Sequence, residues 1–250
     1  MKQTRLIMGM PITLEVVDVS ATGQVLEDVF AYFEYVDQKF STYKDESEIS
    51  RINRGELALE QASDDMQLIF SLAEYTKKAT DGYFDIWRNG HYDPSGIVKG
   101  WAIFNAAAML REMGFAHYYV DAGGDIQMAG NNAQGQHWRV GIRNPFDPQE
   151  IVKVLSISDC GVATSGTYVR GQHIYNPKAA GQLVTDIVSL TVVGPDIYQA
   201  DRFATAAFAM GPAGIVFIEN LEGFEGYMID QNGLATFTTN FERYVLHEAY

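Results

Sequence analysis

The chain has 250 residues, of which 47% are hydrophobic and 20% are charged, and its formal net charge at neutral pH is −14. This length supports a well-packed core, and we expect a single domain over residues 1–250. The negative charge excludes a binder of bulk nucleic acid, which needs a cationic surface to displace counterions from phosphates. It also disfavours contact with an anionic membrane surface.

The cysteine count and the hydropathy pattern limit the class of protein further. The single cysteine, Cys160, excludes an intrachain disulfide and a cysteine-based zinc site. The apolar run after residue 5 is too short for a signal peptide, and no stretch has the ~20 apolar residues of a membrane span. We therefore expect the chain as given to be cytoplasmic, or exported if a leader was removed from it.

The first elements in chain order are an alternating stretch and two amphipathic helices. Residues 6–19 alternate and are rich in β-branched side chains, which predicts a strand. A helix follows Thr22-Gly23, with apolar side chains at three- and four-residue spacings as far as Phe40. Ser63, followed by two aspartates, predicts the N-cap of a second helix that ends near Ala79.

The rest of the chain mixes helices with short strands. A third helical pattern covers residues 97–113, and a fourth runs from Pro195-Asp196 to Met210, followed by a short helix at 213–220. The predicted strands are residues 116–121, 125–129, 137–143, 151–158, 186–194, 226–230 and 234–238. Turn signals separate many of these strands at hairpin spacing, so the sequence predicts an α+β fold with largely antiparallel sheets and packed helices.

Two glycine-containing segments are candidates for binding an anionic ligand. Asp93-Pro94-Ser95-Gly96-Ile97-Val98-Lys99-Gly100 is a loop that enters a helix, where backbone amides and the Lys99 ammonium suit a phosphate. A plain connecting loop is the alternative. Asp121-Ala122-Gly123-Gly124-Asp125 requires a tight turn, and the pattern leaves open whether it is only a hairpin turn or a place where a ligand approaches the backbone.

Two further segments carry side chains suited to catalysis or to metal binding. Val162–Tyr168 offers hydroxyl groups beside a glycine, and His173 follows it as a candidate general base. Asp201 and Thr205 are four residues apart in the predicted fourth helix, so they share a face. A carboxylate and a hydroxyl on one face suit Mg²⁺, although a surface pair is the alternative. The apolar neighbours of Asp201 predict burial, which is costly for an unpaired carboxylate and favours a ligand.

These segments, in this order, resemble the motifs of the FAD:protein FMN transferases, the ApbE-type flavin transferases. Met8-Gly9-Met10 is similar to the family's Met-Gly-Thr opening, and Ser47-Glu48-Ile49-Ser50-Arg51-Ile52-Asn53 is an almost complete family motif. The other matching segments are Phe40–Tyr43, Gly82–Asp85, Asp93–Gly100, Ala122–Asp125, Ala163–Tyr168, His173–Pro177 and Ala200–Thr205. The matches extend over residues 8–211, which is most of the chain.

The resemblance implies a fold of two merged T-fold-like lobes with FAD between them. It implies a magnesium-dependent transfer of FMN from FAD to a Thr or Ser hydroxyl of a target flavoprotein, with release of AMP. The implied metal ligands are Asp201, Thr205 and the backbone carbonyl of Gly96. The implied flavin or nucleotide contacts are Met10, Tyr43, Asp85, Lys99, Gly124, Ser165 and His173. Of the two implied catalytic residues, His173 is the candidate base and Asp201 is mainly a ligand.

The sequence departs from the family pattern in several places. Only Ile86–Tyr92 lies between the Phe-Asp motif and the Lys-Gly loop, which predicts a shorter or more open flavin pocket. Asn176 stands where the family has Asp, Ala180-Gly181 stands for Thr-Gly, and Ser95 stands for Gly. The chain also shows no export signal or lipobox cysteine. Two alternatives therefore stay open: a magnesium-dependent FAD pyrophosphatase that releases FMN and AMP, and a non-catalytic FAD-binding protein.

Overall fold

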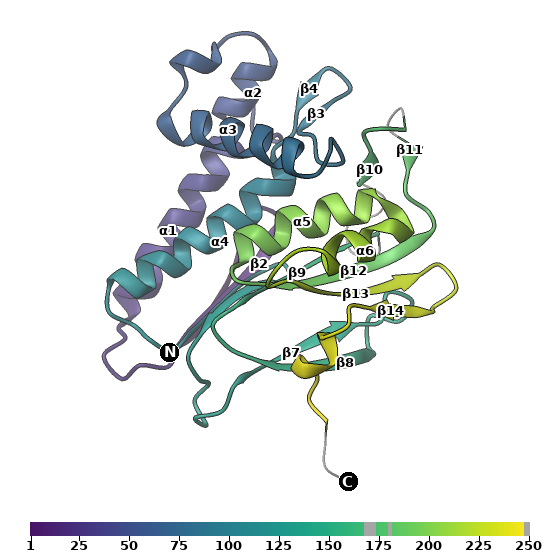
Figure 1. The fold of residues 1–250 in the computed structure, drawn as a ribbon. Coiled ribbons are helices and arrows are strands. Elements are labelled where there is room, and N and C mark those ends of the chain that lie inside the picture. Colours follow the sequence, from purple (N-terminus) through teal and green to yellow (C-terminus); the bar gives the residue numbers. More distant parts are fainter. Residues whose placement is uncertain (168–173, 180–181, 248–250) are drawn as a thin grey trace.

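The computed structural model describes residues 1–167, 174–179 and 182–247. Its centre is an eight-stranded sheet whose neighbouring strands pair antiparallel in the order β1-β2-β5-β6-β9-β12-β13-β14 (Figure 1). These strands are β1 Lys2–Ile7, β2 Met10–Val16, β5 Tyr118–Ala122, β6 Asp125–Ala129, β9 Gly161–Gly166, β12 Ile187–Gly194, β13 Glu225–Asp230 and β14 Ala235–Phe237. The predicted α+β fold with an antiparallel sheet is confirmed.

Helices cover one face of the sheet, and a separate pair of strands covers the other (Figure 1). The helices that cover the sheet are α1 Gly23–Phe40, α4 Ser95–Glu112, α5 Ile197–Ala209 and α6 Gly214–Glu219. Helix α2 Glu48–Asn53 packs on α1 and α3 Asp64–Ala79 packs on α4, and 3₁₀ turns lie at Leu59–Gln61, Gly211–Ala213 and Phe241–Tyr244. The pair on the other face is β7 Trp138–Arg143 with β8 Ile151–Ile157. None of the helices in the described ranges is long and apolar enough to cross a membrane.

The large sheet divides into two halves of four strands. Helices α1 and α4 lie against the half β1-β2-β5-β6, and α5 and α6 lie against the half β9-β12-β13-β14. The halves meet at β6 and β9, which pair only through Ile126 with Val162 and Gln127 with Gly161. Helices α4 and α5 also pack on each other across this seam. This arrangement agrees with two merged lobes.

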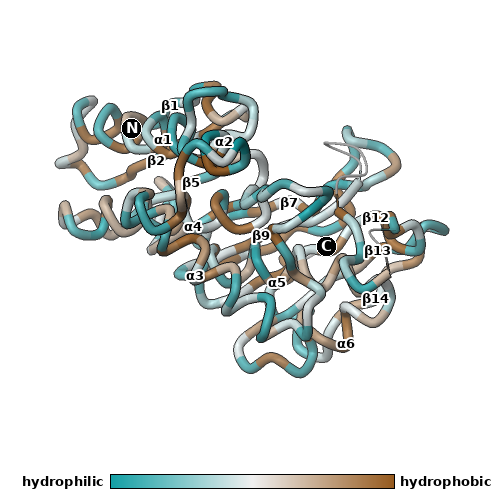
Figure 2. The backbone as a smooth tube through the Cα atoms, turned by 90° about the horizontal axis from the view of Figure 1, so that it is seen from above, coloured by the Kyte–Doolittle hydropathy of each residue, from teal (hydrophilic) through white to brown (hydrophobic). Residues whose placement is uncertain are grey.

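Two hydrophobic cores lie on the two faces of the sheet. The larger core packs the sheet against the helices, and Phe30, Phe33 and Phe208 are fully buried in it. The smaller core lies under β7, where buried Trp138, Val140 and Ile142 alternate with exposed residues. Figure 2 shows hydrophobic stretches along the central strands and hydrophilic ones at many outer turns. Central strands such as β12 are buried on both faces, which explains their nearly continuous apolar sequence.

Two short hairpins stand side by side at one end of the molecule (Figure 1). One is β3 Trp87–Arg88 with β4 His91–Tyr92, and the other is β10 Tyr175–Asn176 with β11 Gln182–Leu183. The hydroxyl of Tyr175 joins them by donating to the backbone carbonyls of Asp85, at 3.1 Å, and Trp87, at 3.2 Å. Neither hairpin follows from the sequence pattern, because strands of two residues show no alternation.

Three local predictions need correction. The predicted strand 6–19 is two strands, because the chain turns at Met8 (φ 55°) and Gly9 (φ 71°). Gly9 is itself a turn signal, because glycine adopts positive φ without strain, so the sequence did offer a reason to break the strand there. Ser63 is at the N-cap of α3, but its hydroxyl does not cap the helix; it donates to the Glu48 carboxylate at 2.7 Å. The hydroxyl-rich segment after Val162, interpreted only as a ligand site, is the central strand β9.

Candidate functional site

A cavity of about 340 Å³ lies at the seam between the two halves of the sheet. Segments that are far apart in the sequence line it: the residues after α1, the connection from α3 to α4, the β5–β6 turn, and parts of β7, β9, β10 and α5. The start of α4 also borders the cavity at Ser95 and Gly96. A helix start and a glycine turn in one cavity favour an anionic ligand.

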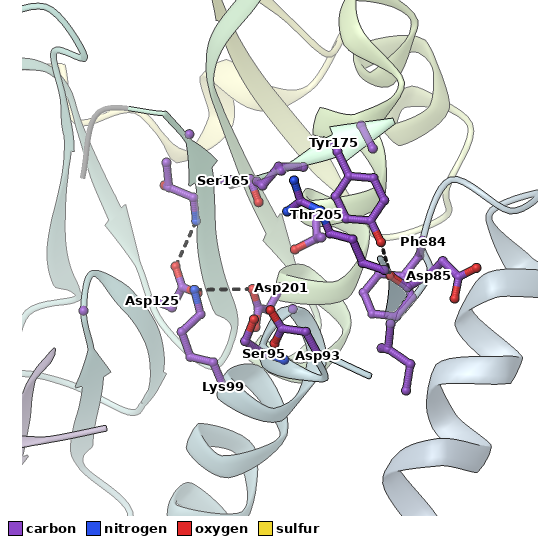
Figure 3. Close-up of a pocket in the computed structure, with 18 of the residues that line it drawn as sticks. Phe84, Asp85, Asp93, Ser95, Lys99, Asp125, Ser165, Tyr175, Asp201 and Thr205 are labelled. Carbon is purple, nitrogen blue, oxygen red and sulfur yellow. Dashed lines mark hydrogen bonds and ion pairs between the residues drawn. The ribbon is translucent and has the colours of Figure 1, made fainter. Parts of the chain in front are cut away.

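Two carboxylates and one ammonium form the charged centre of the cavity. The Nζ of Lys99 on α4 lies 2.5 Å from Oδ2 of Asp125 and 3.6 Å from Oδ1 of Asp201 on α5 (Figure 3). The Lys99 contact with Asp125 is an ion pair without the alignment of a hydrogen bond. Both carboxyl side chains are buried, with 2% of Asp125 and 3% of Asp201 exposed. One ammonium cannot neutralise two carboxylates, so one more positive charge would be needed to balance this centre.

The Asp201 carboxylate is fixed by the packing of α4 against α5. Its Oδ2 accepts a hydrogen bond of 2.8 Å from the backbone amide of Gly100. A Cβ on Gly100 would lie 2.7 Å from the Asp201 Cβ, so the close contact of the two helices requires glycine there. Burial raises the pKa of Asp201 well above its ordinary value, and the nearby Asp125 adds to this while Lys99 opposes it. A bound cation would favour the charged carboxylate.

Asp125 is held by the seam itself. Its Oδ1 accepts a 3.0 Å hydrogen bond from the amide of Thr164 on β9, which links the first half of the sheet to the second. The Thr164 hydroxyl lies 2.8 Å from the hydroxyl of Thr191 on β12. Ser165, the next residue of β9, is buried and lines the cavity. The position of the Asp125 carboxylate therefore depends on the joining of the two halves.

The three residues expected to bind metal all line the cavity. Asp201 and Thr205 are one turn apart on α5, and both line the cavity. Gly96 faces Thr205, because a Cβ on Gly96 would lie 3.3 Å from the Thr205 Cγ2 and 3.8 Å from its Oγ1. The described residues hold no cluster of three or more His, Cys, Asp or Glu side chains suited to a metal. A carboxylate, a hydroxyl and a carbonyl still fit Mg²⁺, which keeps waters or phosphate oxygens as its remaining ligands.

Aromatic and charged side chains form the rim of the cavity. Tyr43 is 96% exposed at the mouth. The guanidinium of Arg88 lies over the Tyr175 ring, 4.2 Å from its centroid. The carboxylate of Asp85 forms a 2.7 Å ion pair with Lys77 and accepts a hydrogen bond from the amide of Trp87. Residues 86–92 form the β3–β4 hairpin, and Ile86 and Arg88 of this segment line one side of the cavity.

The structure brings most of the predicted site residues together. The residues that line the cavity are Tyr43, Asp85, Gly96, Lys99, Gly124, Ser165, Asp201 and Thr205. Met10 lies behind the glycine turn, and a Cβ on Gly123 would be 3.0 Å from its Sδ. The amide of Gly124 already donates to Asp121 at 2.8 Å. His173 lies outside the described residues. The roles assigned to all these residues stay predictions.

Sequence reasoning missed several residues of the site. Asp125 belongs to a quoted motif but was not assigned a role, although an acid beside two glycines was a usable signal. Tyr175 and Arg88 meet through two hairpins that no local pattern reveals. Arg143 lines the cavity from β7, and nothing in its own segment connects it with the other motifs.

Comparison with protein families gives one match over most of the chain. The model described as the ApbE family matches residues 8–91 and 87–228. The chain is 31% identical to the "FAD:protein FMN transferase" of Salmonella typhimurium over 152 residues, which cover 57% of this chain and 43% of that protein. It is 24% identical to the protein of the same name from Haemophilus influenzae, over 87% of this chain and 82% of that one. The chain thus matches less than half the length of the Salmonella relative.

Solved structures share the fold. The ApbE protein from Thermotoga maritima has a TM-score of 0.87 at 19% identity, covering 99% of both chains. The flavin transferase ApbE from Vibrio cholerae has a TM-score of 0.85 at 23% identity, covering 98% of both chains. At these identities the comparison establishes the common fold.

Proposed function

This chain belongs to the ApbE family, and we propose that it is an FAD:protein FMN transferase. The observation that carries the proposal is the cavity at the seam, where Thr205 faces Gly96, Asp201 lies against Gly100, and Lys99 contacts Asp125 and Asp201. The curated relatives named above have this activity in their names. The α4 start suits a pyrophosphate that bridges the two halves of the sheet, and the charged centre would suit it once a cation balances the second carboxylate.

The proposed reaction transfers FMN, through its phosphate, from FAD to an acceptor hydroxyl. The oxygen of an acceptor Thr or Ser hydroxyl forms a bond to the FMN-side phosphorus of FAD. The bond between that phosphorus and the bridging oxygen breaks, and AMP leaves with the bridging oxygen. The hydroxyl proton passes to a base, because a neutral hydroxyl is a poor nucleophile. His173 is the proposed base from its motif position alone.

The residues of this chain position the substrate and balance its charge. Asp201, Thr205 and the Gly96 carbonyl are the proposed ligands of Mg²⁺, which when bound would offset the negative charge of the pyrophosphate and of the leaving AMP. Lys99 contacts both Asp125 and Asp201 and neutralises part of their charge, which reduces the repulsion between the two carboxylates. Gly123 and Gly124, both at positive φ, let a ligand approach the backbone closely.

The test separates the transferase from its two alternatives. The purified chain is incubated with FAD and Mg²⁺, with and without a flavoprotein fragment that carries an acceptor threonine. AMP release with an FMN-sized mass gain on the fragment supports the transferase. AMP with free FMN and no mass gain indicates the pyrophosphatase. Tight FAD binding without AMP release indicates a flavin-binding protein and contradicts the proposal.

A further inference from the structure

A second cavity lies behind the β3–β4 hairpin. Its volume is about 730 Å³, and it lies between α3 and the hairpin. Asp85 and Ile86 line both cavities, so the two share one wall. Trp87 lines the second cavity and Arg88 lines the first, because successive side chains of a strand point to opposite faces. We call the second cavity the hairpin groove.

Aromatic rings form one wall of the hairpin groove. Tyr92 packs edge-on against both Phe70, at a centroid distance of 4.8 Å, and Trp87, at 4.6 Å. Trp87 is nevertheless 49% exposed. Half-exposed tryptophan beside other aromatic rings is typical of the residues that dominate protein–protein interfaces.

The hairpin that carries Trp87 is held firmly. The Asn53 side chain donates to the Tyr92 carbonyl at 2.9 Å and accepts from the Tyr92 amide at 2.7 Å. The amide of Asp93 donates to the Ile86 carbonyl at 2.7 Å, and the Tyr175 hydroxyl donates to the Trp87 carbonyl. A binding residue on a fixed backbone loses little conformational freedom when a partner binds.

The charges around the hairpin groove favour a basic partner. Glu60, Glu74 and Lys77 line the groove, and Lys77 is neutralised by its 2.7 Å ion pair with Asp85. Glu74 is exposed and lies 3.4 Å from Lys78, and Glu60 is also exposed. With Lys77 paired to Asp85 and Glu74 paired to Lys78, Glu60 leaves the groove with a net negative charge, and the chain as a whole carries −14. Electrostatic complementarity of this kind guides partner choice and association rate.

We propose that the hairpin groove binds the acceptor polypeptide beside the hydroxyl that receives FMN. An apolar side chain of the acceptor packs on Trp87, and a lysine or arginine lies near Glu60 and Glu74. The inference rests on the proposed transferase function, which requires a second macromolecular substrate next to the FAD cavity. The shared wall at Asp85 and Ile86 places a segment in the groove directly beside that cavity.

The test uses matched threonine peptides as acceptors, with the full chain, FAD and Mg²⁺. One peptide has leucine and lysine next to the threonine, a second has leucine and glutamate, and a third has glycine and lysine. We expect kcat/KM for FMN mass gain to be about tenfold higher for the leucine–lysine peptide than for the other two. Trp87→Ala should lower this value about tenfold through a higher KM, with unchanged FAD affinity.

Two further variants make the result specific. Leu68, on α3, is also an exposed apolar side chain (44% exposed), but it lies outside the groove. Leu68→Ala should therefore leave kcat/KM unchanged. The double variant Glu60→Lys and Glu74→Lys should reverse the preference, so that the glutamate peptide becomes the better acceptor. This charge reversal tests the groove even if Trp87→Ala folds poorly.

Several outcomes would overturn the inference. Unchanged peptide kinetics in Trp87→Ala and in the charge-reversal variant would exclude the groove as the acceptor site. A Trp87→Ala variant that changes only the oligomeric state, measured by sedimentation, would show that the groove binds a second copy of the chain instead. If the wild type releases AMP but no peptide gains mass, the protein cleaves FAD and the proposed binding of the acceptor in the groove is wrong. Neither AMP nor mass gain would mean that the proposed function itself is wrong.

Discussion

The backbone amide of Gly100 donates a 2.8 Å hydrogen bond to the Asp201 carboxylate, although the two residues are 101 positions apart. This bond joins α4 of one half of the molecule to α5 of the other, at the place where the charged centre of the cavity lies. The cavity chemistry and the packing of the two halves therefore depend on the same contact.

Gly100→Ala should disturb both stability and activity. The new Cβ would lie 2.7 Å from the Asp201 Cβ and 3.0 Å from the Ile197 carbonyl, so α4 and α5 must separate. We expect a loss of about 1–3 kcal/mol in the free energy of unfolding, measured with urea, and a loss of FAD turnover. Gly23→Ala is the control: nothing lies within 4 Å of its Cβ position, and a helical alanine there should be neutral or stabilising. Equal stability of Gly100→Ala and wild type would contradict the close contact.

Asp201→Asn should separate activity from stability. The amide keeps the shape and an acceptor for Gly100, but it removes the buried charge that we propose to bind Mg²⁺. AMP release at saturating FAD should fall about a hundredfold or more. The unfolding free energy at neutral pH should stay equal or rise, because burial disfavours the charged form of Asp201.

The control for this variant lies on the same helix. Asp196 caps α5 by accepting a 2.8 Å hydrogen bond from the Gln199 amide, and asparagine is an equally good cap. Asp196→Asn should therefore keep full activity. An Asp201→Asn variant with wild-type turnover would remove Asp201 from the proposed metal site.

The regular elements were predictable because their causes are local. The helices α1, α3 and α5 show apolar residues at helical spacing, and their boundaries agree with the pattern to within about two residues. Strand β9 was not predicted, because its two glycines and its alanine have low strand propensity. Long-range packing explains its composition: a Cβ on Gly161 would lie 2.1 Å from the Ile197 amide of α5.

The site was predictable in its residues but not in its geometry. The motif order indicated that Lys99, Ser165 and Asp201 act together, and the structure places them around one cavity. The ion pair of Lys99 with Asp125 and the contact of Tyr175 with the β3–β4 hairpin join residues far apart in the chain. Such contacts depend on how the two halves of the sheet meet, which no spacing within one segment encodes.

Cys160 should be unreactive in the native protein. It is buried, and burial raises the pKa of its thiol from its ordinary value to about 12. At pH 8 the thiolate fraction is then about a thousandfold below that of the unfolded chain, and labelling by Ellman's reagent should be slow until urea unfolds the protein. The thiol keeps its proton to a higher pH in the native state than in the unfolded state. Its contribution to the free energy of unfolding is therefore lost as pH rises from about 9 towards 12. Rapid labelling of the native protein would contradict this burial, and Cys160→Ala should reduce the alkaline decrease in stability, to which buried tyrosines such as Tyr32 and Tyr119 also contribute.

Lys99→Met should destabilise the protein because it leaves Asp125 and Asp201 buried without their shared cation. The expected loss in the free energy of unfolding, measured by urea titration without Mg²⁺, is about 3 kcal/mol. Lys39→Met is a matched control, because the Lys39 side chain is similarly buried (14% exposed, against 19% for Lys99). Its ion-pair partner Asp65, however, is 36% exposed. The loss in Lys39→Met should be about 1 kcal/mol or less, because water solvates the remaining carboxylate. Adding Asp125→Asn to Lys99→Met should restore part of the stability by removing one of the two buried charges. If the double variant is no more stable than Lys99→Met, repulsion between the two carboxylates is not the cause of the loss.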